Sequence, residues 1–518
     1  MRNFVLLHVS LFVITVLFSM VLWPYLLLTA AQLLYIPILL KLVCKEQGWF
    51  WKVYPYFAIP AYVSVMVEQI ASPDWGWLLA AIYLLFTVFV AGYGLYRFLH
   101  RGFTNVEEFS IDMGLIYLAM GGSWYFAFIA GIDLGFSPLL TWLTAIHFHY
   151  SAFILPIFVG LIGRLYSSRH YRSAAVLLLV APMAVAVGIT FSRWIEVISV
   201  LFYFYGLGVM IWITWRLFFL QPLQKWFVRI SLTALAVTIS FSMLYVLSNG
   251  FGLFSTTIDF MLRFHGILNC IVFALVGLIG WMLAVPPSRF QPPTFPVSKI
   301  RGRQSADQIG EIGEIRGLSD DLRTYGVIPS ANIIDFYENT VNYRLKATVH
   351  WHTWFKPFAY CYSFISRRTQ QINLPFHNRE IEMTGDIFTV HEGLDGREHV
   401  RIWERKIGKE TVFTALYSQH HSNEKWYMNI ALPLPFTTMT GVLELHDAKG
   451  ALQLTSQRTD GDSDAGVYLS IGKDGLFKLP LQENFLITEN GEEGLQAEHT
   501  MWIFSLPFLT INYRIEKY

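Results

Sequence analysis

The sequence contains little cysteine and little charge. Its three cysteines, Cys44, Cys270 and Cys361, lie far apart, and no Cys-x-x-Cys pair occurs. This spacing excludes a disulfide framework and a cysteine zinc site, and it fits soluble parts that face a reducing compartment. Charged residues make up 14% of the chain, against about 25% in a typical soluble domain. The net charge of +1 gives no indication of a nucleic-acid partner.

Signatures of common catalytic folds are also absent from the sequence. It contains no Walker phosphate loop, no Gly-x-Gly-x-x-Gly, no Gly-x-Ser-x-Gly and no His-Glu-x-x-His. These motifs would supply a phosphate cradle, a nucleophile or a catalytic zinc site. The sequence therefore leaves open whether the protein is an enzyme.

Long apolar segments fill the first 285 residues instead. A bilayer core takes about 20 apolar helical residues, and about ten segments reach this length. The first is too long for a signal-peptide core and lacks a cleavage site, so we interpret it as a membrane helix. The predicted spans are 4–23, 24–43, 53–71, 76–98, 111–131, 138–165, 172–191, 194–217, 226–248 and 258–285.

The distribution of lysine and arginine predicts the orientation of these spans. Cations gather in alternate loops, for example at Arg101, Arg164 and Arg216, whereas the opposite loops carry acidic residues such as Asp74 and Asp133. Cationic loops face the cytoplasm in most membrane proteins. We therefore predict a multi-pass protein of the cell membrane, with both termini in the cytoplasm and the lipid bilayer as a partner.

The pattern changes after the last span. Residues 286–317 are first rich in proline and then polar, which is typical of a linker. From about 318 to 518, short runs of β-branched and aromatic residues alternate with turn residues. One such run, 359–365, is among the predicted strands. The whole chain is thus predicted to be a polytopic α-helical membrane bundle followed by a soluble antiparallel β-rich domain, all-β or α+β in class.

The β-rich domain is expected to lie in the cytoplasm and to fold on its own. Antiparallel sheets of this kind either curve around a ligand or pack a plain core, and the sequence does not separate the two. His350 and His352 would share one face of a strand, as two metal ligands could. No third ligand can be assigned, which favours two exposed histidines.

Polar residues within the predicted spans are candidate functional residues, because polar groups are costly in a bilayer. His147, His149 and Tyr150 lie in the sixth span. Arg263, His265 and Asn269 lie in the tenth, at a similar depth. We predict that these spans touch and that His147 or His149 lies near His265 and Asn269. The two histidines of the sixth span point about 200° apart on a helix, so only one can face His265.

Three interpretations of these histidines remain open: hydrogen bonds that fix helix packing, binding of heme or a metal, and proton relay or solute binding. Glu68, Asp112 and Glu196 lie near span ends and are interpreted as interfacial. The tetrapeptide His147-Phe148-His149-Tyr150 resembles one in the catalytic subunit of heme-copper oxidases, where it implies two heme ligands. The histidine pair of their copper site has no counterpart in the spans, which argues against oxygen reduction.

Taken together, the order of parts resembles the YndJ-like membrane proteins of Gram-positive bacteria. The resemblance lies in the His-Phe-His-Tyr span, in His265-Gly266-x-x-Asn269, and in the ending Met501-Trp502-Ile503-Phe504-x-Leu506-Pro507-Phe508-Leu509-Thr510. It implies the two-part architecture and no particular activity.

Three functions are therefore considered. The first is a binding or transport protein with an intramembrane His/Asn site for a small molecule or lipid, whose cytoplasmic β-domain also binds a ligand or partner. The second is a redox enzyme that uses heme or quinone. The third is a non-catalytic membrane scaffold. An absorption spectrum of the purified protein would separate a heme enzyme from the others.

Overall fold

The computed structural model describes residues 1–44, 48–102, 105–253, 255–290, 295–302, 310–311, 316–390, 392–448, 450–458, 463–471, 475–491 and 494–518. The chain divides into two compact units. A helical unit covers Met1–Arg101 and Asn105–Phe290, and the second unit consists mainly of Gln291–Tyr518.

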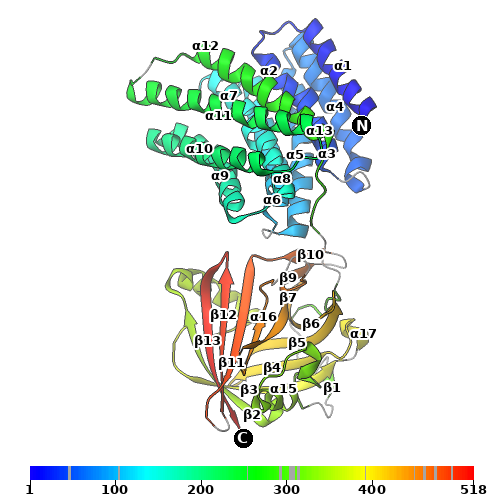
Figure 1. The fold of residues 1–518 in the computed structure, drawn as a ribbon, viewed down its shortest axis with the longest axis vertical. Coiled ribbons are helices and arrows are strands. Elements are labelled where there is room, and N and C mark those ends of the chain that lie inside the picture. Colours follow the sequence, from blue (N-terminus) through cyan, green and yellow to red (C-terminus); the bar gives the residue numbers. More distant parts are fainter. Residues whose placement is uncertain are drawn as a thin grey trace. The chain divides into compact units, whose positions relative to one another are not determined.

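The helical unit is a bundle of antiparallel neighbours joined by short connections (Figure 1). Its elements are α1 (Arg2–Phe18), α2 (Tyr25–Ala30), η1 (Ala31–Tyr35), α3 (Ile36–Val43), α4 (Trp49–Ala71), α5 (Gly76–Arg101), α6 (Val106–Ile129), α7 (Pro138–His149), η2 (Tyr150–Ile154), α8 (Leu155–Leu165), α9 (Arg169–Phe191), α10 (Arg193–Arg216), α11 (Pro222–Phe251), α12 (Ile258–Phe260), η3 (Met261–Gly266), η4 (Leu268–Val276) and α13 (Gly277–Leu283).

The prediction of about ten spans is wrong in its count. Within the described residues, seven helices are long and apolar enough to cross a bilayer. The remaining segments are helical but differ in length or composition. Helix α1 has only 17 residues, α4 contains two prolines and a buried glutamate, and α6 opens with acidic residues. The candidate spans are Tyr25–Val43, Gly76–Arg101, Pro138–Leu165, Arg169–Phe191, Arg193–Arg216, Pro222–Phe251 and Ile258–Leu283. The cytoplasmic placement of the termini stays a prediction.

Three of these candidate spans contain π-helical turns. Elements η1, η2, and the pair η3 and η4 interrupt the α-helices at 31–35, 150–154, 261–266 and 268–276. A π-helical turn shifts the side chains that follow it around the helix axis, and such turns are frequent at functional sites. The candidate residues His149, Tyr150, His265 and Asn269 lie in or beside these segments.

Glycines allow close helix contacts around α6. A Cβ atom at Gly121 would lie 2.7 Å from Nδ1 of His149, and one at Gly122 would overlap Thr87 of α5. Small residues at such crossings let membrane helices approach closely. The contacts fix α7 against α6 and place His149 inside the bundle, where its side chain is fully buried.

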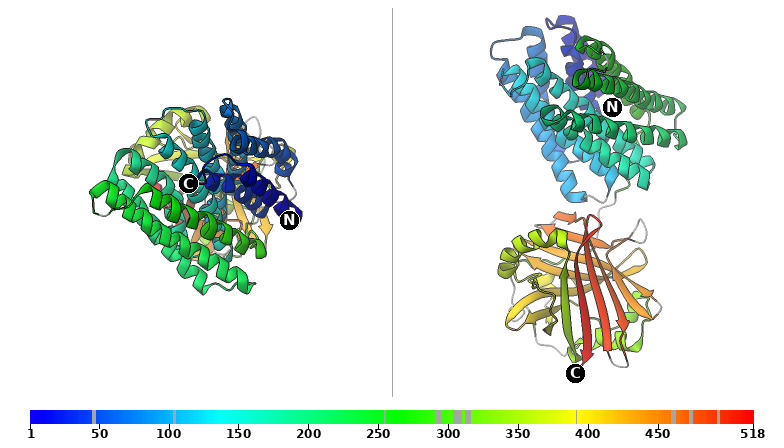
Figure 2. Two further views of the ribbon diagram at one scale, coloured as in Figure 1. Left: turned by 90° about the horizontal axis from the view of Figure 1, so that it is seen from above. Right: turned by 90° about the vertical axis from the view of Figure 1, so that its left-hand side faces the viewer.

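The second unit is an antiparallel barrel (Figure 2). Each strand pairs with its neighbour in the order β10-β9-β7-β6-β5-β4-β3-β2-β13-β12-β11-β8, and β7 pairs again with β8, which closes the sheet. The strands are β2 (Tyr343–Trp351), β3 (Ile381–Val390), β4 (Arg401–Ile407), β5 (Glu410–Ser422), β6 (Lys425–Leu434), β7 (Thr437–Ala448), β8 (Ala451–Thr455), β9 (Gly466–Ile471), β10 (Gly475–Lys478), β11 (Leu481–Glu489), β12 (Gly494–Ile503) and β13 (Leu506–Lys517), with a short β1 (Gly310–Glu311) beside β3.

Alternating apolar residues build the interior of the barrel. Strand β2 alternates buried and less buried positions along its length, as a half-buried strand does. Helix α15 (Ala331–Glu338) buries Ile333 and Phe336 in the same core. Helix α16 (Lys356–Thr369) replaces the strand predicted at 359–365. The predicted β-rich C-terminal part is thus confirmed, as an antiparallel barrel with added helices.

Part of the predicted linker 286–317 packs in this second unit. Phe295 contacts Tyr427 and Tyr468 in one apolar cluster, and Ile300 joins another. Residues 291–294, 303–309 and 312–315 of the linker lie outside the described residues. Independent folding of the barrel stays a prediction, and a fragment that tests it should begin before Phe295.

Candidate functional site

The structure brings His147 close to His265. Their ring centroids lie 6.3 Å apart, with His147 at the end of α7 and His265 in η3. The sixth and tenth predicted spans therefore approach each other at these two side chains. The functional role of this pair stays a prediction.

A closed loop of hydrogen bonds holds His265. Its Nδ1 lies 3.0 Å from the carbonyl oxygen of Thr238, which can only accept, so Nδ1 carries the proton. In the neutral ring, Nε2 then accepts from the side-chain amide of Asn269 at 3.1 Å. The Thr238 hydroxyl lies 2.7 Å from the Asn269 carbonyl oxygen and 2.8 Å from that of Leu235, and its one hydrogen is shared between these two acceptors. Thr238, in α11, was missed at the sequence level, because a single threonine in an apolar span carries no signal.

His147 has one ring nitrogen without a protein partner among the described residues. Its Nδ1 donates to the Leu143 carbonyl oxygen at 2.5 Å, one turn earlier in α7. In the neutral ring, Nε2 is therefore a hydrogen-bond acceptor. His147 lines a cavity of about 280 Å³, and His265 and Asn269 also line this cavity. Leu27, Val200, Ile239 and many other apolar side chains complete its wall.

His149 points away from this cavity. Its Nδ1 donates to the Ala145 carbonyl oxygen at 2.8 Å, and its Nε2 lies 2.8 Å from the Tyr83 hydroxyl, which donates to it. Both side chains are fully buried. His149 therefore joins α7 to α5, and the prediction that only one of the two histidines can face His265 agrees with this geometry.

The other two candidates are engaged elsewhere. The Tyr150 hydroxyl donates to the Leu27 carbonyl oxygen at 2.7 Å, although the side chain also borders the cavity. Arg263 forms an exposed ion pair with Asp259 at 2.9 Å, one turn earlier in its own helix. Arg263 thus lies outside the polar group that His147, His265 and Asn269 form.

This donor set does not suit a heme with two axial histidines. Nε2 of His265 already accepts a hydrogen bond, and both ring nitrogens of His149 are engaged on the opposite side of the helix. Of the three histidines, only His147 has a ring nitrogen whose lone pair is without a partner among the described residues. No group of three or more His, Cys, Asp or Glu side chains suited to a metal occurs in the described part of the chain. In the second unit, the rings of His350 and His352 lie 5.3 Å apart without a third such ligand there.

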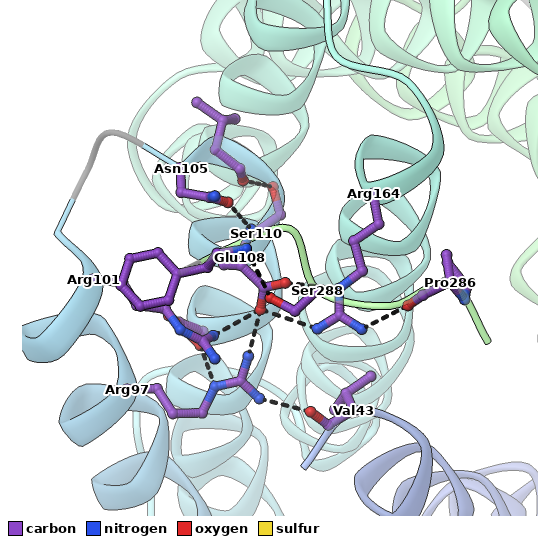
Figure 3. Close-up of polar contacts among 12 residues, drawn as sticks. Val43, Arg97, Arg101, Asn105, Glu108, Ser110, Arg164, Pro286 and Ser288 are labelled. Carbon is purple, nitrogen blue, oxygen red and sulfur yellow. Dashed lines mark hydrogen bonds and ion pairs between the residues drawn. The ribbon is translucent and has the colours of Figure 1, made fainter. Parts of the chain in front are cut away.

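A buried ion cluster was missed by sequence reasoning (Figure 3). Glu108 of α6 accepts from Arg97 at 2.9 Å, from Arg101 at 2.7 Å and from Arg164 at 2.7 Å. Asp112 pairs with Arg97 at 2.7 Å. All five side chains are buried or nearly so. Asp112, predicted to be interfacial, is thus buried beside Arg97, and its side chain is 1% exposed.

The cluster joins several helices through backbone contacts as well. Arg97 donates to the Val43 carbonyl oxygen at the end of α3, and Arg164 donates to that of Pro286 after α13. A signal for it was present in the sequence. Arg97 and Arg101 are four residues apart, as are Glu108 and Asp112, so a helical hairpin brings each pair to one face of its helix.

Comparison with known proteins places this arrangement in a family. The "YndJ-like protein" family matches residues 26–273. The "Uncharacterized membrane protein YndJ" of Bacillus subtilis (strain 168) is 40% identical over 463 residues, which cover 84% of this chain and 83% of that protein. The chain belongs to the YndJ-like family. No solved structure matches it.

The family assignment confirms a multi-pass membrane protein with a β-rich C-terminal domain. The residues of the YndJ-like match include all six candidates, from His147 to Asn269, and the ion cluster around Glu108. The cavity beside His147 and the cluster in Figure 3 are thus both parts of the YndJ-like helical unit.

Proposed function

We propose that this YndJ-like protein binds an amphipathic molecule from the bilayer, with an apolar chain and a hydroxyl group, in the cavity beside His147. The observation that carries the proposal is that His147, whose Nε2 has no protein partner among the described residues, lines a cavity of about 280 Å³ with mostly apolar walls. Cavities that combine apolar walls with a few placed polar groups are typical small-molecule sites.

The protonation pattern determines the class of the head group. The Leu143 carbonyl holds the proton of His147 on Nδ1, so Nε2 accepts a hydrogen bond and selects a donor such as a hydroxyl. A second cavity-lining group, Glu196, is already paired with Arg193 at 2.7 Å. Glu196 therefore favours no additional cationic head group.

His265 acts beside His147 as a positioning residue. Its loop with Thr238 and Asn269 uses both ring nitrogens, so it has no lone pair for the ligand. The loop ties η3 and η4 to α11 and keeps the cavity wall rigid. Loss of any member of the loop should loosen binding without removing the acceptor on His147.

Photolabelling of the full-length protein in lipid nanodiscs tests the proposal. The probe is a long-chain alcohol with a diazirine in its chain. Ala186→Phe fills the cavity from α9, whereas Val187→Phe adds the same ring at a neighbouring position that is 42% exposed and does not line the cavity. Labelling of peptides from α9, α10 and α11 should fall in the first variant alone.

A second comparison isolates the acceptor. His147→Leu should lower labelling by the alcohol to the level of its methyl ether, since the ether cannot donate a hydrogen bond. Equal labelling of wild type by alcohol and ether, or unchanged labelling in Ala186→Phe, would contradict the proposal.

A further inference from the structure

We propose that a second cavity in the helical unit, lined by Gln32, Glu68, Gln69 and Tyr125, binds a small organic ammonium compound. This cavity has a volume of about 310 Å³. Its wall is formed by α2, η1, the end of α4, the start of α5, and parts of α6 and α7. It is distinct from the cavity beside His147, although Trp142 borders both.

An unpaired carboxylate oxygen identifies this cavity as a site. Oε2 of Glu68, on a side chain that is 8% exposed, makes no hydrogen bond within the described residues. The buried side chains of Gln32, Gln69 and Tyr125 share the cavity wall, where Gln69 interacts with Tyr125 and Gln32 with Tyr83. A buried polar group without a partner costs about 1–3 kcal/mol, so the unpaired carboxylate beside the cavity indicates a bound polar species.

The ionisable side chains that line the cavity are acidic. Glu68 and Asp74 both line it, and no lysine, arginine or histidine of the described part of the chain forms an ion pair with either carboxylate. The Glu68 carboxylate is pressed against Gly76, where an added Cβ would lie only 2.4 Å from Oε2. The lack of a side chain at Gly76 thus leaves room for the carboxylate at the cavity wall.

The other lining groups select a hydrogen-bonding organic cation. The Gln32 and Gln69 carbonyl oxygens and the Tyr125 hydroxyl can accept from an ammonium group, which has donors and no acceptor. Tyr25, Phe128 and Trp142 add aromatic faces, with the Tyr25 and Trp142 rings 5.2 Å apart. Aromatic faces attract desolvated ammonium groups, and the volume exceeds that of a single metal ion.

Binding to the full-length protein in detergent tests this site. The probes are butylammonium, putrescine and tetramethylammonium chloride, with butanol as the neutral isostere of butylammonium and sodium chloride as the salt control. Isothermal titration should show saturable binding of butylammonium or putrescine and none of butanol or sodium. Failure of both butylammonium and putrescine to bind would overturn the proposal, and so would equal binding of butanol or sodium.

Variants then locate the site. Glu68→Gln should weaken binding by about tenfold or more, because the charged partner of a desolvated cation is removed. Gly76→Ala should weaken it too, by displacing the carboxylate. Glu196→Gln, which removes a carboxylate at the other cavity, is the matched control and should bind as wild type does. A thermal unfolding curve for each variant separates lost binding from lost fold, and full affinity in folded Glu68→Gln would exclude this site.

Discussion

The helical unit buries carboxylates in two different surroundings. Glu108 is in contact with three arginines, and both of its oxygens are engaged (Figure 3). Glu68 is 8% exposed, has no cationic partner among the described residues, and faces a cavity. A buried charge whose hydrogen bonds and ion pairs are all made within the protein holds helices together. A buried carboxylate that lacks such partners and borders a cavity can instead interact with a ligand.

The histidines of α7 repeat this contrast over two residues. His149 uses both ring nitrogens within the protein, and His147 leaves one for the cavity. Similar residue types in one span therefore have different roles, and the difference lies in whether the protein itself completes their hydrogen bonds. Each prediction that follows changes one polar side chain, whose partners within the protein are either complete or incomplete.

Replacement of Glu108 should have the largest effect. Glu108→Gln leaves Arg97, Arg101 and Arg164 close together without their shared counterion. Removal of one partner from a buried ion pair destabilises proteins by about 3–5 kcal/mol. We expect a strongly lowered unfolding temperature in detergent, or failure of the protein to accumulate in membranes. Glu107→Gln, one position away, is the control, and an equal loss in both variants would contradict a specific role for the cluster.

Replacement of the two α7 histidines by leucine, one at a time, should lower the stability of the protein by different amounts. His149→Leu leaves the fully buried Tyr83 hydroxyl without its acceptor, at a cost of about 1–3 kcal/mol. His147→Leu removes only a bond to its own helix and should cost less than about 1 kcal/mol. Unfolding temperatures of the two variants in the same detergent provide the comparison. A larger loss in His147→Leu would reverse the assignment of roles.

His499 of the barrel lies between these two situations, because it is buried and has only a weak partner in Glu483. Its imidazole stacks on Phe485 with centroids 3.7 Å apart, and Nε2 lies 3.4 Å from the Glu483 carboxylate. Burial lowers the pKa of His499 below its ordinary value of 6.5, against the opposing effect of Glu483. The unfolded chain then takes up the proton first, so the stability of the barrel should fall as the pH drops below about 6.5. The slope from one group is at most about 1.4 kcal/mol per pH unit.

Hydrogen exchange of β11 and β12 amides, corrected for intrinsic exchange rates, measures this slope. His499→Phe should reduce the slope, and His446→Gln, at a side chain that is 38% exposed, should leave it unchanged. A slope that persists in His499→Phe would assign the pH dependence to another group.

The sequence predicted the features that depend on local pattern. Apolar length identified the helical unit, period-two alternation identified the barrel, and matching depth brought His147 to His265. The count of spans was wrong because apolar runs alone do not show the short length of α1, the prolines and buried glutamate of α4, or the acidic start of α6. The strand expected at 359–365 is helical, because α16 begins at Lys356-Pro357 and exposes much of that apolar run.

The second cavity was beyond sequence reasoning for a different reason. Gln32, Glu68 and Tyr125 come from three helices, and nothing in the sequence shows that their polar atoms converge without completing each other's hydrogen bonds. The π-helical segment η1 helps to place Gln32, and a π-helical turn has no dependable sequence signal. Convergence of this kind depends on packing between helices.

Glu68→Gln should have the smallest effect on stability of all these changes. Whether it raises or lowers the unfolding temperature is the sharpest test of the contrast between Glu68 and Glu108. The unpaired carboxylate gains no ion pair from the described protein, and its burial is unfavourable without one. A neutral amide of the same shape removes that penalty, so the unfolding temperature without added ligand should stay the same or rise slightly. An added ammonium probe should raise the unfolding temperature of wild type and not that of Glu68→Gln, because only a ligand-binding state is stabilised by mass action. If Glu68→Gln instead loses as much stability as Glu108→Gln, the two carboxylates are both structural, and the contrast between them fails.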